Sequence, residues 1–97
     1  MGMRGQYKNK RDGNEKDIFA TIEANGFVIW PLDTPCDAIV GRKGVTYLIE
    51  VKNGPKAGLS GPQKKFRAKW TGHYQILSTI EEAEDWARKI RGLENDR

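Results

Sequence analysis

The sequence predicts an α/β domain in which helices flank a mixed four-stranded sheet. Three strand-like segments follow one another between positions 27 and 52, separated by Pro31 and by a glycine-bounded turn at 41–44, as in an antiparallel meander. A helical segment then leads to a fourth short strand, and strands joined through a helix normally run parallel. The length of 97 residues fits one such domain with one core.

The first helix is expected to begin at Asn14, a good N-cap residue, and to end before Gly26. Between them, apolar residues recur at helical spacing: Ile18, Phe19 and Ile22. Residues 1–13 show no such periodicity and carry several cations. We therefore interpret them as a basic flexible arm, and residues 14–97 as a single folded domain.

The remaining elements are predicted from runs of β-branched and aromatic residues and from helical spacing. The expected strands are 27–30, 36–40, 45–52 and 74–77, and the expected helices are 63–70 and one that begins after Ser78 or Thr79. Residues 53–62, with three glycines and two prolines, are expected to form a loop. The expected apolar stripe of the last helix is Ile80, Ala83, Ala87 and Ile90. The three tryptophans (Trp30, Trp70 and Trp86) are expected in the core, with base stacking as the alternative role and an exposed position as the alternative for Trp30 beside Pro31.

The amino-acid inventory excludes several kinds of chemistry. Cys36 is the only cysteine and His73 the only histidine, so the chain cannot form an internal disulfide or supply four ligands to a structural zinc site. No nucleophile motif accompanies His73, and no apolar run approaches the roughly 20 residues that span a bilayer. We therefore expect no membrane partner and a reducing, cytoplasmic location.

Three charged side chains are predicted to share one face of the sheet. Glu50 and Lys52 are two positions apart in a strand, so they leave it on the same side. A hairpin loop at 43–44 would place Asp37 opposite Glu50, and a loop at 42–43 would place it on a diagonal. Either register brings two carboxylates together, which favours a divalent cation such as Mg²⁺ between them. With a lysine beside it, this set suits the hydrolysis of a phosphodiester.

The alternative is an exposed sheet face on which the Glu–Lys pair contributes little. The charge distribution favours the site. Residues 53–70 carry five cations and no acid, residues 1–16 carry five cations and two acids, and residues 17–52 have a net charge of −2. Basic segments on both sides of an acidic centre are typical of a nucleic-acid backbone held over a metal. The predicted DNA contacts are Lys8, Lys10, Arg11, Lys56, Lys64 and Lys65, and for the last two a solvated helix face is the alternative.

The order of these residues resembles that of the PD-(D/E)XK nuclease superfamily, which implies a restriction-endonuclease-like core with the order αβββαβ. The residues that carry the resemblance are Pro35-Cys36-Asp37, Glu50-Val51-Lys52 and Gln63. Residues 59–66 resemble the L-S-x-x-Q segment of VRR-type nucleases, and residues 14–28 resemble the opening of small Holliday-junction resolvases. Cys36 departs from the pattern, because the proline of the superfamily usually precedes the aspartate directly.

The resemblance implies a role for each matching residue. Asp37, Glu50 and the backbone carbonyl of Val51 would bind Mg²⁺ or Mn²⁺. Lys52 would position or activate the attacking water, and Gln63 would orient Lys52 or a substrate phosphate.

The resemblance also implies that Glu15 supplies a further carboxylate near the metal. In the first turn of a helix, however, Glu15 is favourable through the helix dipole alone. Gln63 has an alternative as well, because it lies three residues after Ser60 and completes a capping box. Asp33 is a weaker rival of Asp37 for the metal position.

The residues and the resemblance together predict a metal-dependent endonuclease that acts on branched or flapped DNA, as a homodimer where paired cuts are needed. One alternative is a non-catalytic nucleic-acid-binding module with the same fold. Another is an interaction subunit whose activity needs a partner. Two close carboxylates beside a lysine favour the nuclease, because a binding module has no evident use for them.

Overall fold

The computed structural model describes residues 13–52 and 59–95 and has the predicted α/β architecture. Its elements in chain order are α2 (Gly13–Ala24), β1 (Val28–Pro31), β2 (Ala38–Arg42), β3 (Val45–Val51), α3 (Gly61–Lys69), β4 (His73–Leu77) and α4 (Ile80–Asn95). β2 begins two residues later than expected. α3 begins two residues earlier, inside the expected loop, because the first turn of a helix accepts Pro62.

The four strands form one mixed sheet in the order β1-β2-β3-β4. The first two pairings are antiparallel, and β3 pairs with β4 in parallel through the α3 crossover, as predicted. Lys43 and Gly44 form the loop between β2 and β3, with φ angles of 52° and 82°, and Arg42 pairs with Val45. Two positive φ angles characterise the type I′ hairpin turn. Of the two registers considered, the structure therefore has the one with the loop at 43–44.

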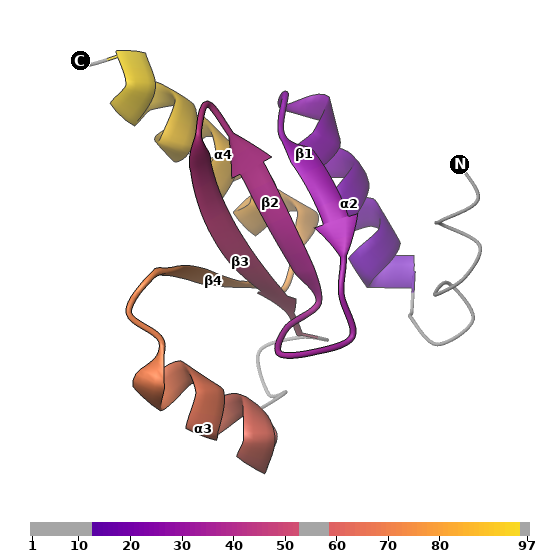
Figure 1. Ribbon diagram of the computed structural model, residues 1–97. Coiled ribbons are helices and arrows are strands. Elements are labelled where there is room, and N and C mark those ends of the chain that lie inside the picture. Colours follow the sequence, from indigo (N-terminus) through magenta and orange to yellow (C-terminus); the bar gives the residue numbers. More distant parts are fainter. Residues whose placement is uncertain (1–12, 53–58, 96–97) are drawn as a thin grey trace.

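One face of the sheet is covered by α2 and α4 and carries the hydrophobic core (Figure 1). The apolar stripe predicted for α2 is buried there, together with Val40 and Ile49 of the two central strands. Trp86 of α4 packs on Phe27 and Tyr47, with ring centroids 5.2 and 5.4 Å away. This single cluster accounts for most of the apolar burial, and Trp86 is the tryptophan that the core contains.

The other two tryptophans are exposed, which contradicts the prediction for Trp70 and agrees with the alternative for Trp30. Trp30 follows Ile29, which packs on the core, so its side chain points to the opposite face of β1 and is 54% exposed. Trp70 is 42% exposed at the end of α3. Ile80 is exposed as well, because it is the first residue of α4 and precedes the turn that packs on the sheet.

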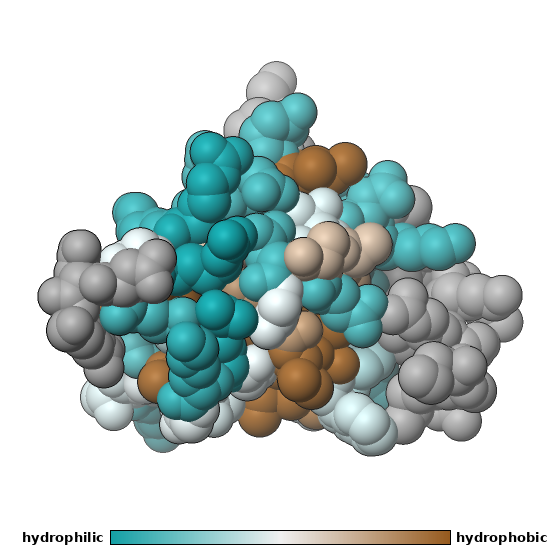
Figure 2. Space-filling model, turned by 90° about the horizontal axis from the view of Figure 1, so that it is seen from above, coloured by the Kyte–Doolittle hydropathy of each residue, from teal (hydrophilic) through white to brown (hydrophobic). Residues whose placement is uncertain are grey.

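The opposite face of the sheet is covered only in part. α3 lies to one side of the sheet, beyond β4 in Figure 1, and none of its residues is buried. Seen from above the view of Figure 1, the molecule has a largely hydrophilic surface with hydrophobic patches between the polar side chains (Figure 2). No helix within the described ranges is both long and apolar enough to cross a membrane.

Asn14 does not cap α2 as predicted. The helix begins at Gly13, and the Asn14 side-chain amide donates to the Ser78 carbonyl (2.9 Å) and to the Lys52 carbonyl (3.4 Å). These two carbonyls lie just beyond the ends of β4 and β3. Asn14 therefore satisfies two backbone acceptors and ties the start of α2 to the end of the sheet that carries the site.

Candidate active site

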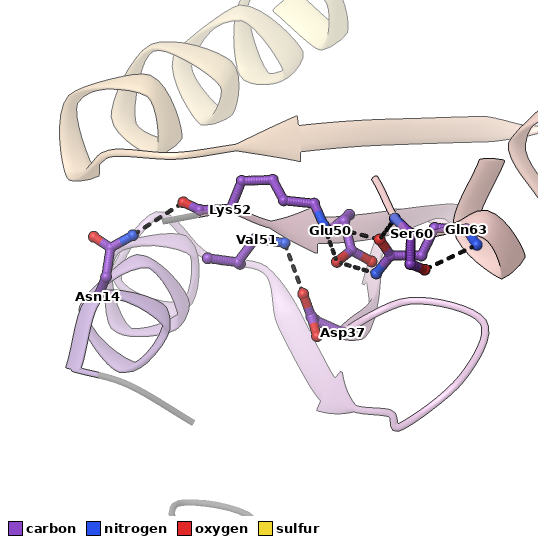
Figure 3. A network of polar contacts seen from close by, with 7 residues as sticks. All are labelled: Asn14, Asp37, Glu50, Val51, Lys52, Ser60 and Gln63. Atoms are coloured by element: carbon purple, nitrogen blue, oxygen red, sulfur yellow. Dashed lines mark hydrogen bonds and ion pairs between the residues drawn. The ribbon is translucent and has the colours of Figure 1, made fainter. Parts of the chain in front are cut away.

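The predicted acidic residues meet near the end of β3 (Figure 3). Ala38 pairs with Ile49, and the amide of Asp37 also donates to the Ile49 carbonyl at 3.0 Å. Two successive residues thus face one residue of β3, which is the arrangement of a β-bulge and redirects the side chain at that point. Asp37 therefore lies just before β2 and not within a strand as predicted, but it still reaches the face that carries Glu50.

A hydrogen bond anchors Asp37 to the backbone of β3. Its Oδ2 accepts from the Val51 amide at 2.8 Å. Because the N–H and C=O of a strand residue project from the same edge, the Val51 carbonyl also points to the side on which Asp37 lies. The two groups that the resemblance implies as metal ligands therefore lie on one side of the strand.

Gln63 joins α3 to the site through both ends of its side-chain amide. Its Oε1 accepts from the Ser60 backbone amide (2.9 Å) and from Lys52 Nζ (2.8 Å), and its Nε2 donates to Glu50 Oε2 (2.7 Å). The Ser60 hydroxyl accepts from the Gln63 backbone amide at 3.3 Å, which completes the predicted capping box. Gln63 therefore caps α3 and contacts two site residues with the same group.

The ammonium of Lys52 is held between two acceptors. It lies 2.8 Å from Gln63 Oε1 and 3.6 Å from Glu50 Oε2, and its side chain is only 14% exposed. An ammonium carries three donors, and the bond to Gln63 uses one of them. Lys52 can therefore hold its position and still donate to a water or to a phosphate oxygen.

Glu50 is a buried carboxyl with incomplete hydrogen bonding. The residue is 2% exposed, and its Oε1 is buried with no hydrogen-bond partner among the described residues. Burial and then the negative charge of Asp37 raise the pKa of Glu50 from 4.5 to about 7, against the opposite effect of Lys52. Such an oxygen is unfavourable in a folded protein unless a proton or a cation meets it.

The donor set fits a hard divalent cation. Two carboxylates and a backbone carbonyl are oxygen ligands, the type that Mg²⁺ and Mn²⁺ prefer, and Mg²⁺ usually keeps several waters as well. Nowhere in residues 13–52 and 59–95 do three or more acidic, histidine or cysteine side chains gather as a metal-binding group. Glu15 and Asp33 therefore do not join Asp37 and Glu50 in a larger cluster.

The other predicted residues differ in their exposure. Glu15 is buried in the first turn of α2, Cys36 is buried as well, and His73 is exposed. Lys64 and Lys65 are exposed on α3. The remaining predicted DNA contacts lie outside the described residues: Lys8, Lys10, Arg11 and Lys56.

Tyr74 is a neighbour of the site that was not predicted. It pairs with Leu48 in the parallel β3–β4 ladder, and Leu48 shares a face of β3 with Glu50. Its hydroxyl is buried without a hydrogen-bond partner among the residues that the structure describes. Burial and then the charge of Glu50 raise the pKa of Tyr74 to about 12. The phenol therefore stays neutral at physiological pH.

Two residues of the site's surroundings were missed. The place of Ser60 beside Gln63, by contrast, was predicted from the capping box. Asn14 and Tyr74 gave no usable signal, because their contacts depend on where the ends of distant elements meet.

Comparisons with protein-family models, with curated proteins and with solved structures find no match to this chain. The functional assignment therefore rests on the residues and their geometry. The relevant features are the two carboxylates on one sheet face, the lysine held beside them and the buried oxygen without a partner among the described residues.

Proposed function

We propose that this protein is a metal-dependent endonuclease that hydrolyses phosphodiester bonds in DNA at a site of the PD-(D/E)XK type. The observation that carries the proposal is the carboxylate of Glu50, which is buried beside Asp37 while Oε1 has no partner among the described residues. Such a group is unfavourable unless a proton or a cation meets it, and the second carboxyl of Asp37 beside it favours a divalent cation. The adjacent Lys52 supplies a positive charge of the kind that stabilises phosphoryl chemistry.

Asp37, Glu50 and the Val51 carbonyl would hold Mg²⁺ or Mn²⁺. When bound, the ion would supply Lewis-acid chemistry, lowering the pKa of a water and offsetting charge on the phosphate. The protein prepares both carboxylates for this, because the Val51 amide fixes Asp37 and the Gln63 amide fixes Glu50.

Lys52 would act on the substrate side of the site. Its ammonium would donate a hydrogen bond to the attacking water or to a nonbridging phosphate oxygen, where negative charge grows as the attacking oxygen bonds to phosphorus while the leaving oxygen departs on the opposite side. Gln63 keeps it in place. Because Oε1 of Gln63 accepts from two donors, the amide cannot rotate by half a turn without losing both bonds.

The charge distribution supports DNA as the substrate. Lys64 and Lys65 directly follow Gln63, and no acidic residue occurs between positions 53 and 80. Such cations bind backbone phosphates without reading sequence, which favours selection by shape, as in a junction or a flap. A homodimer would bring two sites to one junction. The restriction-endonuclease-like assignment of the fold belongs to this same proposal.

The proposal is tested by a cleavage assay on blunt-duplex, flap and four-way-junction DNA with Mg²⁺, Mn²⁺ or EDTA. We expect cleavage with either ion, faster on the branched substrates, and no cleavage with EDTA. Absence of cleavage on every substrate with Mn²⁺ would overturn the proposal. Tight binding without turnover would instead favour the non-catalytic module.

Two variants test whether Glu50 and Lys52 belong to the active site. Glu50→Gln and Lys52→Ala should each slow cleavage at least about a hundredfold, since each removes a charge that acts on the transition state. Lys89→Ala, which changes an exposed lysine of α4, is the matched control and should cleave like the wild type. Circular dichroism checks that all three fold. Full activity in Glu50→Gln or Lys52→Ala would place the active site elsewhere.

A further inference from the structure

α3 presents a stripe of side chains that runs from the site to the end of the helix. Gln63, Phe66 and Trp70 are three and then four positions apart, so they lie on one side of the helix. Phe66 stacks on Trp70, with ring centroids 5.4 Å apart, and it lies 5.9 Å from the ring of Tyr74. Because α3 has no buried residue, core packing does not account for this stripe.

Trp70 is exposed and yet firmly positioned. Its Nε1 donates to the His73 carbonyl at 3.0 Å, and Phe66 packs on its ring system. Gly72 permits the close approach of the indole, because a Cβ at this position would lie 2.6 Å from Cζ2 of Trp70. An indole that is held in place but 42% exposed leaves aromatic surface open to another planar group.

The aromatic residues share α3 with several cations. Four lie on α3, and none of them forms an ion pair within the described part of the chain: Lys64, Lys65, Arg67 and Lys69. The guanidinium of Arg67 lies 5.3 Å from the centroid of the Tyr74 ring. A polyanion that also carries planar groups would match both the charge and the aromatic surface.

We propose that α3 and the turn after it bind a single DNA strand adjoining the cut, with one base stacked on Trp70 and the phosphates held by the cations of α3. This proposal rests on the proposed function, because it takes the residues around Gln63 to be the active site. It goes further in naming the substrate as DNA with a single-stranded arm.

The geometry favours a single strand over a duplex. Inside a duplex each base is stacked on both faces, so an internal base can lie on an indole only after it has left the helix. Trp70 follows Gln63 by seven residues, which is about 10 Å along the helix at roughly 1.5 Å per residue. That length equals about three base steps in a stacked strand, at roughly 3.4 Å each, and fewer steps in an extended strand. A strand with one phosphate in the site can therefore reach Trp70.

The test measures binding in EDTA, where no cleavage occurs. The affinity of the full chain for fluorescein-labelled oligo(dT) and for a blunt duplex is determined by fluorescence anisotropy. We expect Trp70→Ala to weaken binding of the single strand about tenfold, the scale of one base–aromatic stack, and to change duplex binding little. Trp70→Phe should recover most of the affinity, because it keeps a ring at this position.

Two further variants separate stacking from unrelated effects. Trp30→Ala removes the other exposed tryptophan, on β1, and should bind like the wild type. Gly72→Ala keeps the indole but pushes it from its place, so it should weaken single-strand binding as Trp70→Ala does. Thermal unfolding confirms that each variant is folded.

Equal affinity of the wild type and Trp70→Ala for oligo(dT) would overturn the proposal. A change in oligomeric state in Trp70→Ala, measured by light scattering, would also overturn it and identify a second copy of the chain as the occupant. Failure of the nuclease proposal is distinguishable. Trp70-dependent binding without cleavage overturns only the nuclease, whereas cleavage with Trp70-independent binding overturns only the single-strand site.

Discussion

Ile49 and Glu50 are neighbours on β3 and point to opposite faces of the sheet. Ile49 is fully buried among apolar side chains of the face covered by α2 and α4. Glu50 is almost equally buried, but its neighbours are Gln63, Lys52 and Asp37. The comparison shows that burial has two causes in this small domain. On one face it results from apolar packing, and on the other it encloses a charged centre.

The two faces contribute differently to stability. Apolar burial favours folding by roughly 25 cal/mol per Å². A buried carboxylate beside a second one opposes folding unless a cation or a proton compensates it. Changes on the core face should therefore destabilise the protein, whereas changes on the site face should remove activity at little cost in stability.

The largest expected effect on stability is on the core face. Ile49→Ala should lower the free energy of unfolding by about 3 kcal/mol, because it leaves a cavity in a fully buried cluster. Urea unfolding followed by circular dichroism measures it. Ile39→Ala on the half-covered face is the matched control, with an expected loss of about 1 kcal/mol. Equal losses would show that the two faces are packed alike.

A bound divalent ion should offset the free-energy cost of the two neighbouring carboxylates on the site face. Mn²⁺ at a hundred times its Kd should raise the free energy of unfolding of the wild type by about 2.7 kcal/mol. Glu50→Gln, which lacks the ligand charge, should respond much less. Thermal unfolding with and without Mn²⁺ gives both values. The same stabilisation in the two proteins would show that the ion binds elsewhere.

Protons should act on the same carboxylate when no metal is present. The pKa of Glu50 is about 7 in the folded protein against an ordinary 4.5, so the folded state binds this proton more tightly than the unfolded chain does. The stabilisation is complete below about pH 4.5 and is lost as the pH rises through about 7. In EDTA, lowering the pH from about 8 to about 5 should therefore stabilise the wild type by about 2 kcal/mol relative to Glu50→Gln.

This difference is read from urea unfolding of the two proteins at several pH values. If the free energies of unfolding of the wild type and Glu50→Gln changed in parallel with pH, the carboxyl of Glu50 would not titrate with a raised pKa.

The smallest expected effect concerns Tyr74. Its hydroxyl is buried without a hydrogen-bond partner among the described residues, so Tyr74→Phe removes an unsatisfied group. The free energy of unfolding should stay unchanged or rise by up to about 1 kcal/mol, measured by urea unfolding. A loss of about 1 kcal/mol or more would mean that the hydroxyl has a partner in solution, and the contrast between the faces would then be weaker.

Much of the fold could be predicted because its signals are local. Helical spacing identified the stripe of α2, β-branched residues identified β3, and Gly26 marked the end of the helix with a φ of 92°. Asn14 was wrongly predicted as an N-cap, because an asparagine amide serves equally well to bind distant carbonyls. Trp70 was wrongly expected in the core, and for Trp30 the exposed alternative holds, because composition does not reveal which face of an element is covered.

The candidate site was predicted less completely than the fold. The face shared by Glu50 and Lys52 follows from the two-residue period of a strand. Asp37 reaches that face through a bulge, which no local sequence pattern predicted. For Gln63, a capping role and a role in the site were weighed as alternatives, and the structure shows that a single amide makes both sets of contacts.

The sequence by itself determined the order of the elements, the face shared by Glu50 and Lys52, and the basic character of residues 53–70. Each depends on residues a few positions apart, whose spacing and charge act locally. Only the tertiary structure decided that Gln63 reaches Glu50 and that Oε1 of this residue has no partner among the described residues. Those outcomes depend on segments that are distant in the chain. Such segments meet only in the folded protein, where packing excludes water from between them.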